Sequence, residues 1–211
     1  MHVQGHIGLP LAQAVPPVAR RGGGSLPKAL GSGQAGCLLA SCDRRGAIGR
    51  RDYAMLLLAL RLGLRAGEIV ALALDIDWRA GEIMVRGKGR CRVRLALPAD
   101  VGEALAGCLR QGRSPTECRM LFLRSVAPLR GLGAPAVSWV VYRACDRAGL
   151  PRVGARRLRH TAATGMLRAG AWLSYVGQVL RHRSAMTTAI YAKVDHGALG
   201  TLARPWPGSA A

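Results

Sequence analysis

The chain contains the stretch Arg156-Arg157-Leu158-Arg159-His160, which leads into a predicted helix over residues 157–169. Arginines at the N-terminus of a helix favour an anion, because the unpaired backbone N–H groups there add to their positive charge. A second basic stretch, Leu180-Arg181-His182, follows, and Tyr191 lies nine residues after its histidine. A tyrosine that follows separated arginines and a histidine in this order indicates covalent transfer of a phosphoryl group.

A shorter stretch, Gly63-Leu64-Arg65-Ala66-Gly67-Glu68, precedes this set. We expect Arg65 at the start of a helix just after a glycine turn. Glu68 then lies one turn away, where it can hold the Arg65 side chain. Taken by itself, such a pair three residues apart is an ordinary surface feature of helices.

A second short stretch, Gly87-Lys88-Gly89-Arg90, lies between two predicted strands, 82–86 and 91–97. Lys88 is therefore expected at the tip of a hairpin, where the glycines allow a tight turn. A lone lysine in a turn is usually just a solvated side chain. Lysine is rare in this chain, however, since it has three lysines among its 31 basic residues. Together, the ordered stretches are more specific than any one of them.

These residue types suit cleavage of a phosphodiester without a metal ion. Arginine keeps its charge at any working pH, and its planar fork matches two phosphate oxygens. Histidine and lysine supply hydrogen bonds and protons. A tyrosine oxygen is a suitable nucleophile once local positive charge offsets its ordinary pKa of about 10. The six cysteines form no Cys-x-x-Cys pair, so no metal site is expected. No other cofactor is expected, because the arginine, histidine and lysine side chains supply the charge and the protons.

The ordered set resembles the catalytic domain of the tyrosine recombinases, the phage integrases and Xer-type recombinases. The resemblance covers residues 26–203. It implies two arginines that clamp the phosphate, a lysine that protonates the leaving 5′ oxygen, a histidine that donates to a nonbridging oxygen, and a tyrosine nucleophile. In that order of roles, the implied catalytic residues are Arg65 and Arg159, Lys88, His182 and Tyr191.

One position departs from the family's His-x-x-Arg-His box, because Arg156 stands where the family has its first histidine. Arginine can donate hydrogen bonds to phosphate but cannot exchange protons. If a histidine there assists deprotonation of the tyrosine, this chain should cleave more slowly. Glu68, Arg156 and His160 are expected to support the site. The arginines expected to contact the DNA backbone are Arg86, Arg90, Arg92, Arg157, Arg181 and Arg183.

The net charge of +20 points to a polyanionic partner, which the resemblance identifies as double-stranded DNA. The chain has no apolar run of the ~18 residues that a membrane span needs. Its N-terminus also lacks the pattern of a signal peptide. We therefore expect no membrane association, and a place in the bacterial cytoplasm with the nucleoid. The resemblance also implies a tetramer on DNA, in which residues 196–208 dock on a neighbouring subunit.

The expected fold is mainly helical with a small antiparallel hairpin or three-stranded sheet. Residues 1–45 look like a linker with one short helix near residues 37–42, residues 46–203 like the catalytic domain, and residues 204–211 like a flexible tail. Most of the family's N-terminal core-binding domain is thus expected to be missing. The predicted helices cover residues 50–62, 65–72, 98–110, 135–148, 157–169, 171–180 and 187–194, with a short strand at 120–123.

The leading hypothesis is a site-specific DNA recombinase that forms a 3′-phosphotyrosyl intermediate. Three alternatives remain open at this point. A truncated, catalytically impaired DNA-binding remnant would bind DNA without forming an adduct. An enzyme like the type IB topoisomerases would relax any supercoiled plasmid. A basic RNA- or ribosome-binding protein with a chance motif would not depend on Tyr191.

Overall fold

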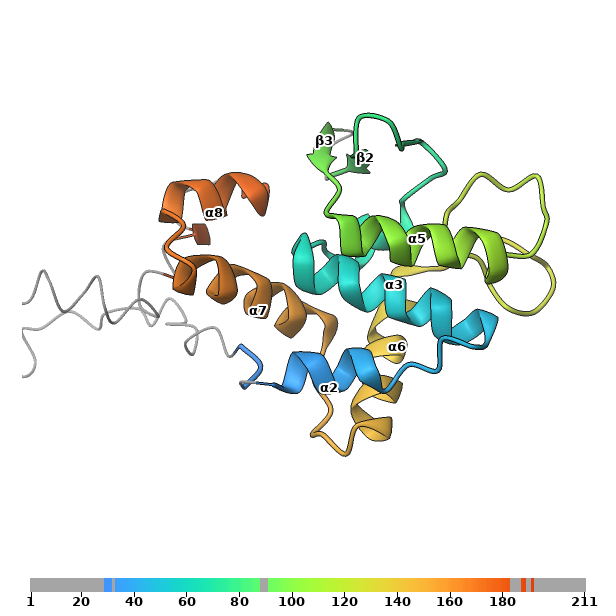
Figure 1. Ribbon diagram of the computed structural model, residues 1–211, viewed down its shortest axis with the longest axis horizontal. Helices are drawn as coiled ribbons and strands as arrows, with labels where there is room; N and C mark the ends of the chain where they lie inside the picture. Colours follow the sequence, from blue (N-terminus) through green and yellow to red (C-terminus); the bar gives the residue numbers. More distant parts are fainter. Residues whose placement is uncertain (1–28, 32, 88–90, 183–186, 189–190, 192–211) are drawn as a thin grey trace, which may run out of the picture.

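Helix α3 (Ala47–Arg61) runs through the centre of the molecule, where α2, α4, α5, α6 and α7 contact it (Figure 1). The structure is a computed structural model that describes residues 29–31, 33–87, 91–182, 187, 188 and 191. The side chains from Ala54 to Ala59 are at most 2 % exposed. This segment is apolar on every side, so it is stable only when other elements cover it on every side.

All of the other described helices except α8 contact α3, and their apolar faces form one continuous core with it. The order of the helices follows the prediction from apolar periodicity, with ends that differ by a few residues. The other described helices are α2 (Gln34–Ala40), α4 (Ala66–Val70), α5 (Ala99–Gln111), α6 (Ala134–Arg147), α7 (Ala155–Arg168) and α8 (Leu173–Val179).

The described strands form one antiparallel sheet in the order β1-β2-β3, with β1 at Ile76–Asp77, β2 at Glu82–Arg86 and β3 at Arg92–Ala96. Ile83 and Val85 of β2 are buried, as expected for a strand with one face on the core. The prediction of a mainly helical fold with a small antiparallel sheet is thus confirmed.

The segment just before α3 packs on the rest of the protein. Leu38 of α2 is fully buried, and the backbone N–H of Leu30 donates to Oγ1 of Thr161 on α7 at 2.9 Å. The described part of the expected linker region therefore contributes to the core. The domain boundary at residue 46 stays a prediction.

A second, smaller cluster lies where α7 and α8 meet the C-terminal part of the chain. It is formed by Ala163, Val176, Leu180 and Tyr191, which are all buried. This cluster places Tyr191 beside the N-terminal half of α7. The expected site residues therefore come from elements that the core holds together.

The strand expected at residues 120–123 is not formed. In its place, Met120 pairs with Ala73 and Leu123 with Gly131 as isolated bridges. Most of the helix expected at 187–194 lies outside the described residues. Among the helices that the structure describes, none is long and apolar enough to cross a membrane.

Candidate active site

A cavity of about 500 Å³ opens between the start of α4, the start of α7 and the segment around His182. Six of its lining residues are among those that the sequence predicts for the site. They are Arg65, Arg156, Arg159, His160, His182 and Tyr191. Residues that are more than 120 positions apart in the sequence thus line the same cavity.

Arg65 caps helix α4 from its extended backbone conformation, and Glu68 completes the cap. The Glu68 carboxylate accepts hydrogen bonds from the backbone N–H of Arg65 and from its Nη1, both at 2.8 Å. The contact with the backbone N–H is the glutamate half of a capping box, and it satisfies an N–H that the helix leaves unpaired. The Arg65 side chain is 45 % exposed, so its guanidinium remains accessible to a ligand.

Glu68 also binds Arg181, whose Nη2 donates to Oε2 at 2.8 Å. Its carboxylate is buried, and burial alone would raise the pKa of Glu68. The hydrogen bonds from Arg181 and Arg65 outweigh this effect, so the pKa lies below its ordinary value. Glu68 is therefore a carboxylate at neutral pH and the common anchor of this arginine cluster.

Arg159 is nearly buried, and its guanidinium donates to the carbonyl of Gly63 at 2.5 Å and to the carbonyl of Leu180. Burial lowers the pKa of Arg159 to about 10, and the charge of Arg65 adds to this effect. Arg159 still carries its charge at neutral pH. Its hydrogen bonds tie the turn before α4 to the end of α8.

Gly63 makes this turn possible. Its φ of +58° lies in the left-handed region that glycine adopts without cost. A Cβ atom on Gly63 would clash with Cδ2 of Leu180. The glycine is thus required both by the backbone conformation and by the close approach of α8.

Tyr191 is the most buried member of the set, with an exposed fraction of 1 %. Its hydroxyl lies 2.5 Å from Nδ1 of His160. Its ring is stacked on that of His182, with an interplanar angle of 5° and a centroid distance of 6.2 Å. Burial raises the pKa of Tyr191, whereas the charges of Arg159 and Arg156 oppose that rise.

His182 is fixed by two contacts. Its Nδ1 lies 2.8 Å from Oγ1 of Thr188, and its backbone N–H donates to the carbonyl of Gly177 at 3.0 Å. Burial is the main cause that lowers the pKa of His182 to about 4, and the charge of Arg159 adds to it. His182 is therefore neutral at neutral pH and donates hydrogen bonds without carrying charge.

Thr188 was not predicted from the sequence. A threonine in a stretch of small and apolar residues carries no signal of a site. Its role is visible only from its contact with His182. The anchoring of Arg181 is likewise visible only from its contact, because its side chain is 10 % exposed and donates to Glu68.

Among the described residues, three more of the predicted set do not line the cavity. Arg157 lies at the side of α7, where its Nη2 is 3.5 Å from the carbonyl of Ala29. Arg86 and Arg92 are opposite each other in the sheet. Three others lie outside the described residues, namely Lys88, Arg90 and Arg183.

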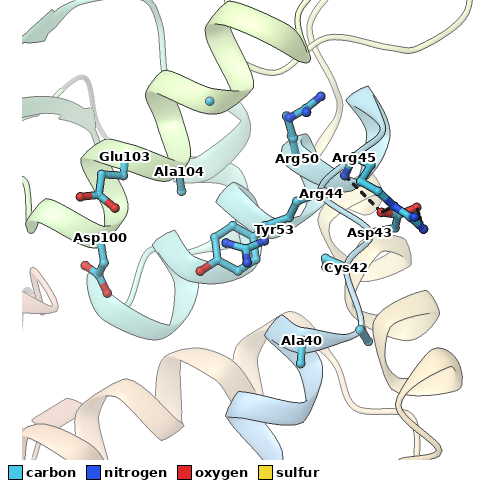
Figure 2. A pocket seen from close by; sticks show the side chains of 12 residues that line it. Ala40, Cys42, Asp43, Arg44, Arg45, Arg50, Tyr53, Asp100, Glu103 and Ala104 are labelled. Atoms are coloured by element: carbon cyan, nitrogen blue, oxygen red, sulfur yellow. Dashed lines mark hydrogen bonds and ion pairs between the residues drawn. The ribbon is translucent and has the colours of Figure 1, made fainter.

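A larger cavity, of about 800 Å³, lies between the α2–α3 connection and α5, and none of the predicted residues lines it (Figure 2). The arginines that line it already have partners. Arg45 pairs with Asp43 at 3.0 Å, and the Arg44 guanidinium lies 4.7 Å from the centre of the Tyr53 ring. Arg50 donates to the carbonyl of Gln111 at 3.5 Å. This cavity is therefore a poorer phosphate site than the first. Over the described part of the chain, no group of three or more His, Cys, Asp or Glu residues could hold a metal ion.

The known proteins to which the chain is similar include integrases and recombinases. A family model described as "Phage integrase family" matches residues 29–197. The chain is 51 % identical to "Putative integrase/recombinase y4rA" of Sinorhizobium fredii, over 98 % of this chain and 51 % of the relative. It is 33 % identical to "Tyrosine recombinase XerD" of Ralstonia nicotianae, over 84 % of this chain and 59 % of the relative. The chain thus spans just over half the length of each of these two relatives.

The fold is also similar to that of solved structures. One is the XerH site-specific recombinase bound to its palindromic difH substrate in a post-cleavage complex. It matches with a TM-score of 0.72 and 26 % sequence identity, over 84 % of this chain and 53 % of XerH. The similarity of fold therefore extends over most of this chain.

Proposed function

The chain belongs to the phage integrase family, and from this premise we propose that it is a tyrosine-type site-specific recombinase acting on double-stranded DNA. The observation that carries the proposal is the cavity that Arg65, Arg159, His182 and Tyr191 line together. These residues come from separate parts of the chain, and a chance motif has no reason to converge in space. The RNA-binding alternative therefore has no support from the site.

The two arginines bind the nonbridging oxygens of the scissile phosphate. Arg65 is the more exposed of the two, and its Nη1 donates a hydrogen bond to Glu68. Arg159 is held by backbone carbonyls and has further N–H groups for the phosphate, because a guanidinium has five. Such fixed donors need no reorganisation when charge develops in the transition state.

Tyr191 is the nucleophile. A bond forms between its phenolic oxygen and phosphorus, the bond from phosphorus to the 5′ oxygen breaks, and Lys88 protonates the leaving oxygen. The products are a 3′-phosphotyrosyl link and a free 5′ hydroxyl. Religation is the reverse reaction, with a 5′ hydroxyl from another strand. No cofactor takes part in these steps.

The arginines outside the cavity contact the DNA backbone. The net charge of +20 favours such contacts, and the XerH relative is described with its DNA substrate. We propose this role for Arg86, Arg90, Arg92, Arg157 and Arg183. Arg181, which the sequence also suggests for this role, is 10 % exposed and paired with Glu68, so it holds the arginine cluster instead. The protein acts at the bacterial nucleoid, and strand exchange takes place in a tetramer on DNA.

Covalent trapping tests this function. Wild type, Tyr191→Phe and Tyr175→Phe are each incubated with nicked duplexes from the DNA that flanks the gene, and SDS-resistant protein–DNA bands are scored. Tyr175 is a matched control because it is 59 % exposed and does not line the cavity. We expect an adduct from wild type and Tyr175→Phe, and none from Tyr191→Phe.

Two outcomes would support the alternatives. DNA binding without an adduct, also after the chain is joined to a core-binding domain of a relative, would favour an impaired remnant. Relaxation of any supercoiled plasmid without recombination would favour a topoisomerase-like enzyme. An adduct that survives in Tyr191→Phe would rule out Tyr191 as the nucleophile.

A further inference from the structure

The hydroxyl of Tyr191 contacts a histidine that is not the first histidine of the family's box. Nδ1 of His160 lies 2.5 Å from this oxygen, whereas the family's first histidine is replaced by Arg156. Resting on the proposed function, we infer that His160 accepts the proton of Tyr191 when the phenolic oxygen attacks phosphorus. His160 is thereby a further catalytic residue of this chain.

The geometry favours His160 over the other candidates. Arg156 has no free lone pair at working pH, so it cannot accept a proton. The ring of His182 lies parallel to that of Tyr191, at 5° and with the ring centroids 6.2 Å apart. Its Nδ1 is engaged by Oγ1 of Thr188. Within the described residues, His160 is thus the group whose ring nitrogen is directed at the phenol.

The charges around His160 keep its lone pair free. Burial lowers the pKa of His160, and the positive charges of Arg156, Arg159 and Arg157 lower it further below its ordinary value. The ring is therefore neutral at neutral pH. A neutral imidazole that accepts at Nδ1 carries its own proton at Nε2.

The same positive charges act on the phenol in the opposite sense. Arg159, Arg156 and Arg65 favour the phenolate, while burial disfavours it. As the bond to phosphorus forms, the phenolic oxygen becomes more acidic and its proton moves to Nδ1. The charged groups around this proton are the arginines already named; His182 lies beside Tyr191, and Arg181 acts on His182.

Cleavage moves one proton to His160 and one proton from Lys88. The proton of Tyr191 goes to Nδ1 of His160, and the phenolic oxygen forms a bond to phosphorus. The bond to the 5′ oxygen breaks, and Lys88 supplies the proton for that oxygen. Religation returns the proton from His160 to Tyr191, so no external acid or base is consumed.

The test separates a base from a structural contact by comparing His160→Asn with His160→Ala. The side-chain oxygen of asparagine can replace Nδ1 as a hydrogen-bond acceptor, but it has no basicity. Alanine removes both properties. We expect both variants to form the Tyr191 adduct roughly 100-fold or more slowly, as for loss of a general base. DNA affinity and the melting temperature of His160→Asn should stay close to those of wild type.

The dependence on pH and on the leaving group gives a second readout. Because the phenol ionises by itself at high pH, the deficit of His160→Asn should shrink as pH rises. A duplex with sulfur in place of the leaving 5′ oxygen needs no acid, so it should rescue Lys88→Ala but not His160→Asn. A structural contact would show neither pattern.

Two results would overturn the inference. His160→Asn could cleave at the wild-type rate at every pH, or the sulfur substrate could rescue it as fully as Lys88→Ala. If instead the wild-type protein binds DNA but forms no adduct, that result contradicts the proposed function. It does not bear on which residue accepts the proton. The wild-type reaction therefore distinguishes the two failures.

Discussion

Glu68 accepts a hydrogen bond at 2.8 Å from Arg181, although 113 residues separate the two in sequence. The same carboxylate holds Arg65 at 2.8 Å. Arg159 is 3.8 Å away, within the range of an ion pair. A single buried anion thus brings three like charges together at the wall of the cavity, where they would otherwise repel one another.

Replacing Glu68 by glutamine should disrupt this arrangement. A neutral amide leaves the guanidiniums of Arg159 and Arg181 buried without their counter-charge, which costs about 3 kcal/mol or more. We expect a lower urea midpoint and, from the displaced Arg65, a large loss of adduct formation. Glu103→Gln is the matched control, because the same change falls on an exposed carboxylate. Equal midpoints for the two variants would contradict an anchoring role for Glu68.

Two substitutions of Arg181 separate the cost of its backbone strain from the contribution of its ion pair. Its φ of +54° lies in the left-handed region, which costs a residue other than glycine about 1 kcal/mol. Arg181→Ala loses the pair with Glu68 and keeps the strain, whereas Arg181→Gly loses the pair and relieves the strain. Chemical denaturation should rank the glycine variant about 1 kcal/mol above the alanine variant, with both below wild type. The reverse order of the two variants would show that strain at this position is negligible.

Gly63 and Gly67 are four residues apart but should respond to alanine in opposite ways. At Gly63, the Cβ atom would clash with Leu180 and the φ of +58° would be strained. At Gly67, inside α4, an added Cβ atom would meet no other atom within 4 Å. We expect Gly63→Ala to destabilise by about 2 kcal/mol and Gly67→Ala to stabilise by up to about 1 kcal/mol. Thermal unfolding of the pair checks both signs.

Local patterns in the sequence were sufficient for the elements and for part of the site. The apolar periodicity around α3 and the glycine after it predict a helix and its end, and the spacing of Arg65 and Glu68 predicts their contact. Both features depend on residues within one or two turns of each other, so no tertiary information is needed.

The remaining contacts depend on packing between distant segments. The Glu68–Arg181 pair requires an arginine in the left-handed region, and no local pattern predicts that conformation. The orientation of the Tyr191 hydroxyl toward His160 depends on how the small cluster around Val176 and Leu180 packs. The strand expected near Met120 failed because its partners are irregular loops, which provide isolated bridges and no ladder.

Stability should fall as pH drops from about 7.5 to about 5, and His182 is a main cause. Its pKa falls from 6.5 to about 4 on folding, so in this window the unfolded chain takes up a proton that the folded chain refuses. The unfolded state is therefore favoured by acid, by roughly 1–2 kcal/mol from this residue. His160, whose pKa is also lowered, should add to the loss in the same direction.

Urea unfolding at both pH values measures this effect, and His182→Gln isolates it. Glutamine does not titrate, so the loss of stability between the two pH values should be about 1–2 kcal/mol smaller in the variant than in wild type. Glu68 does not interfere in this window, because its pKa is lowered from 4.5 and its contribution is lost only at more acidic pH. If His182→Gln loses as much stability as wild type, the neutral histidine is not held by burial beside the arginines. The stacking of His182 on Tyr191 would then have to persist with a charged ring, which the nearby charge of Arg159 opposes.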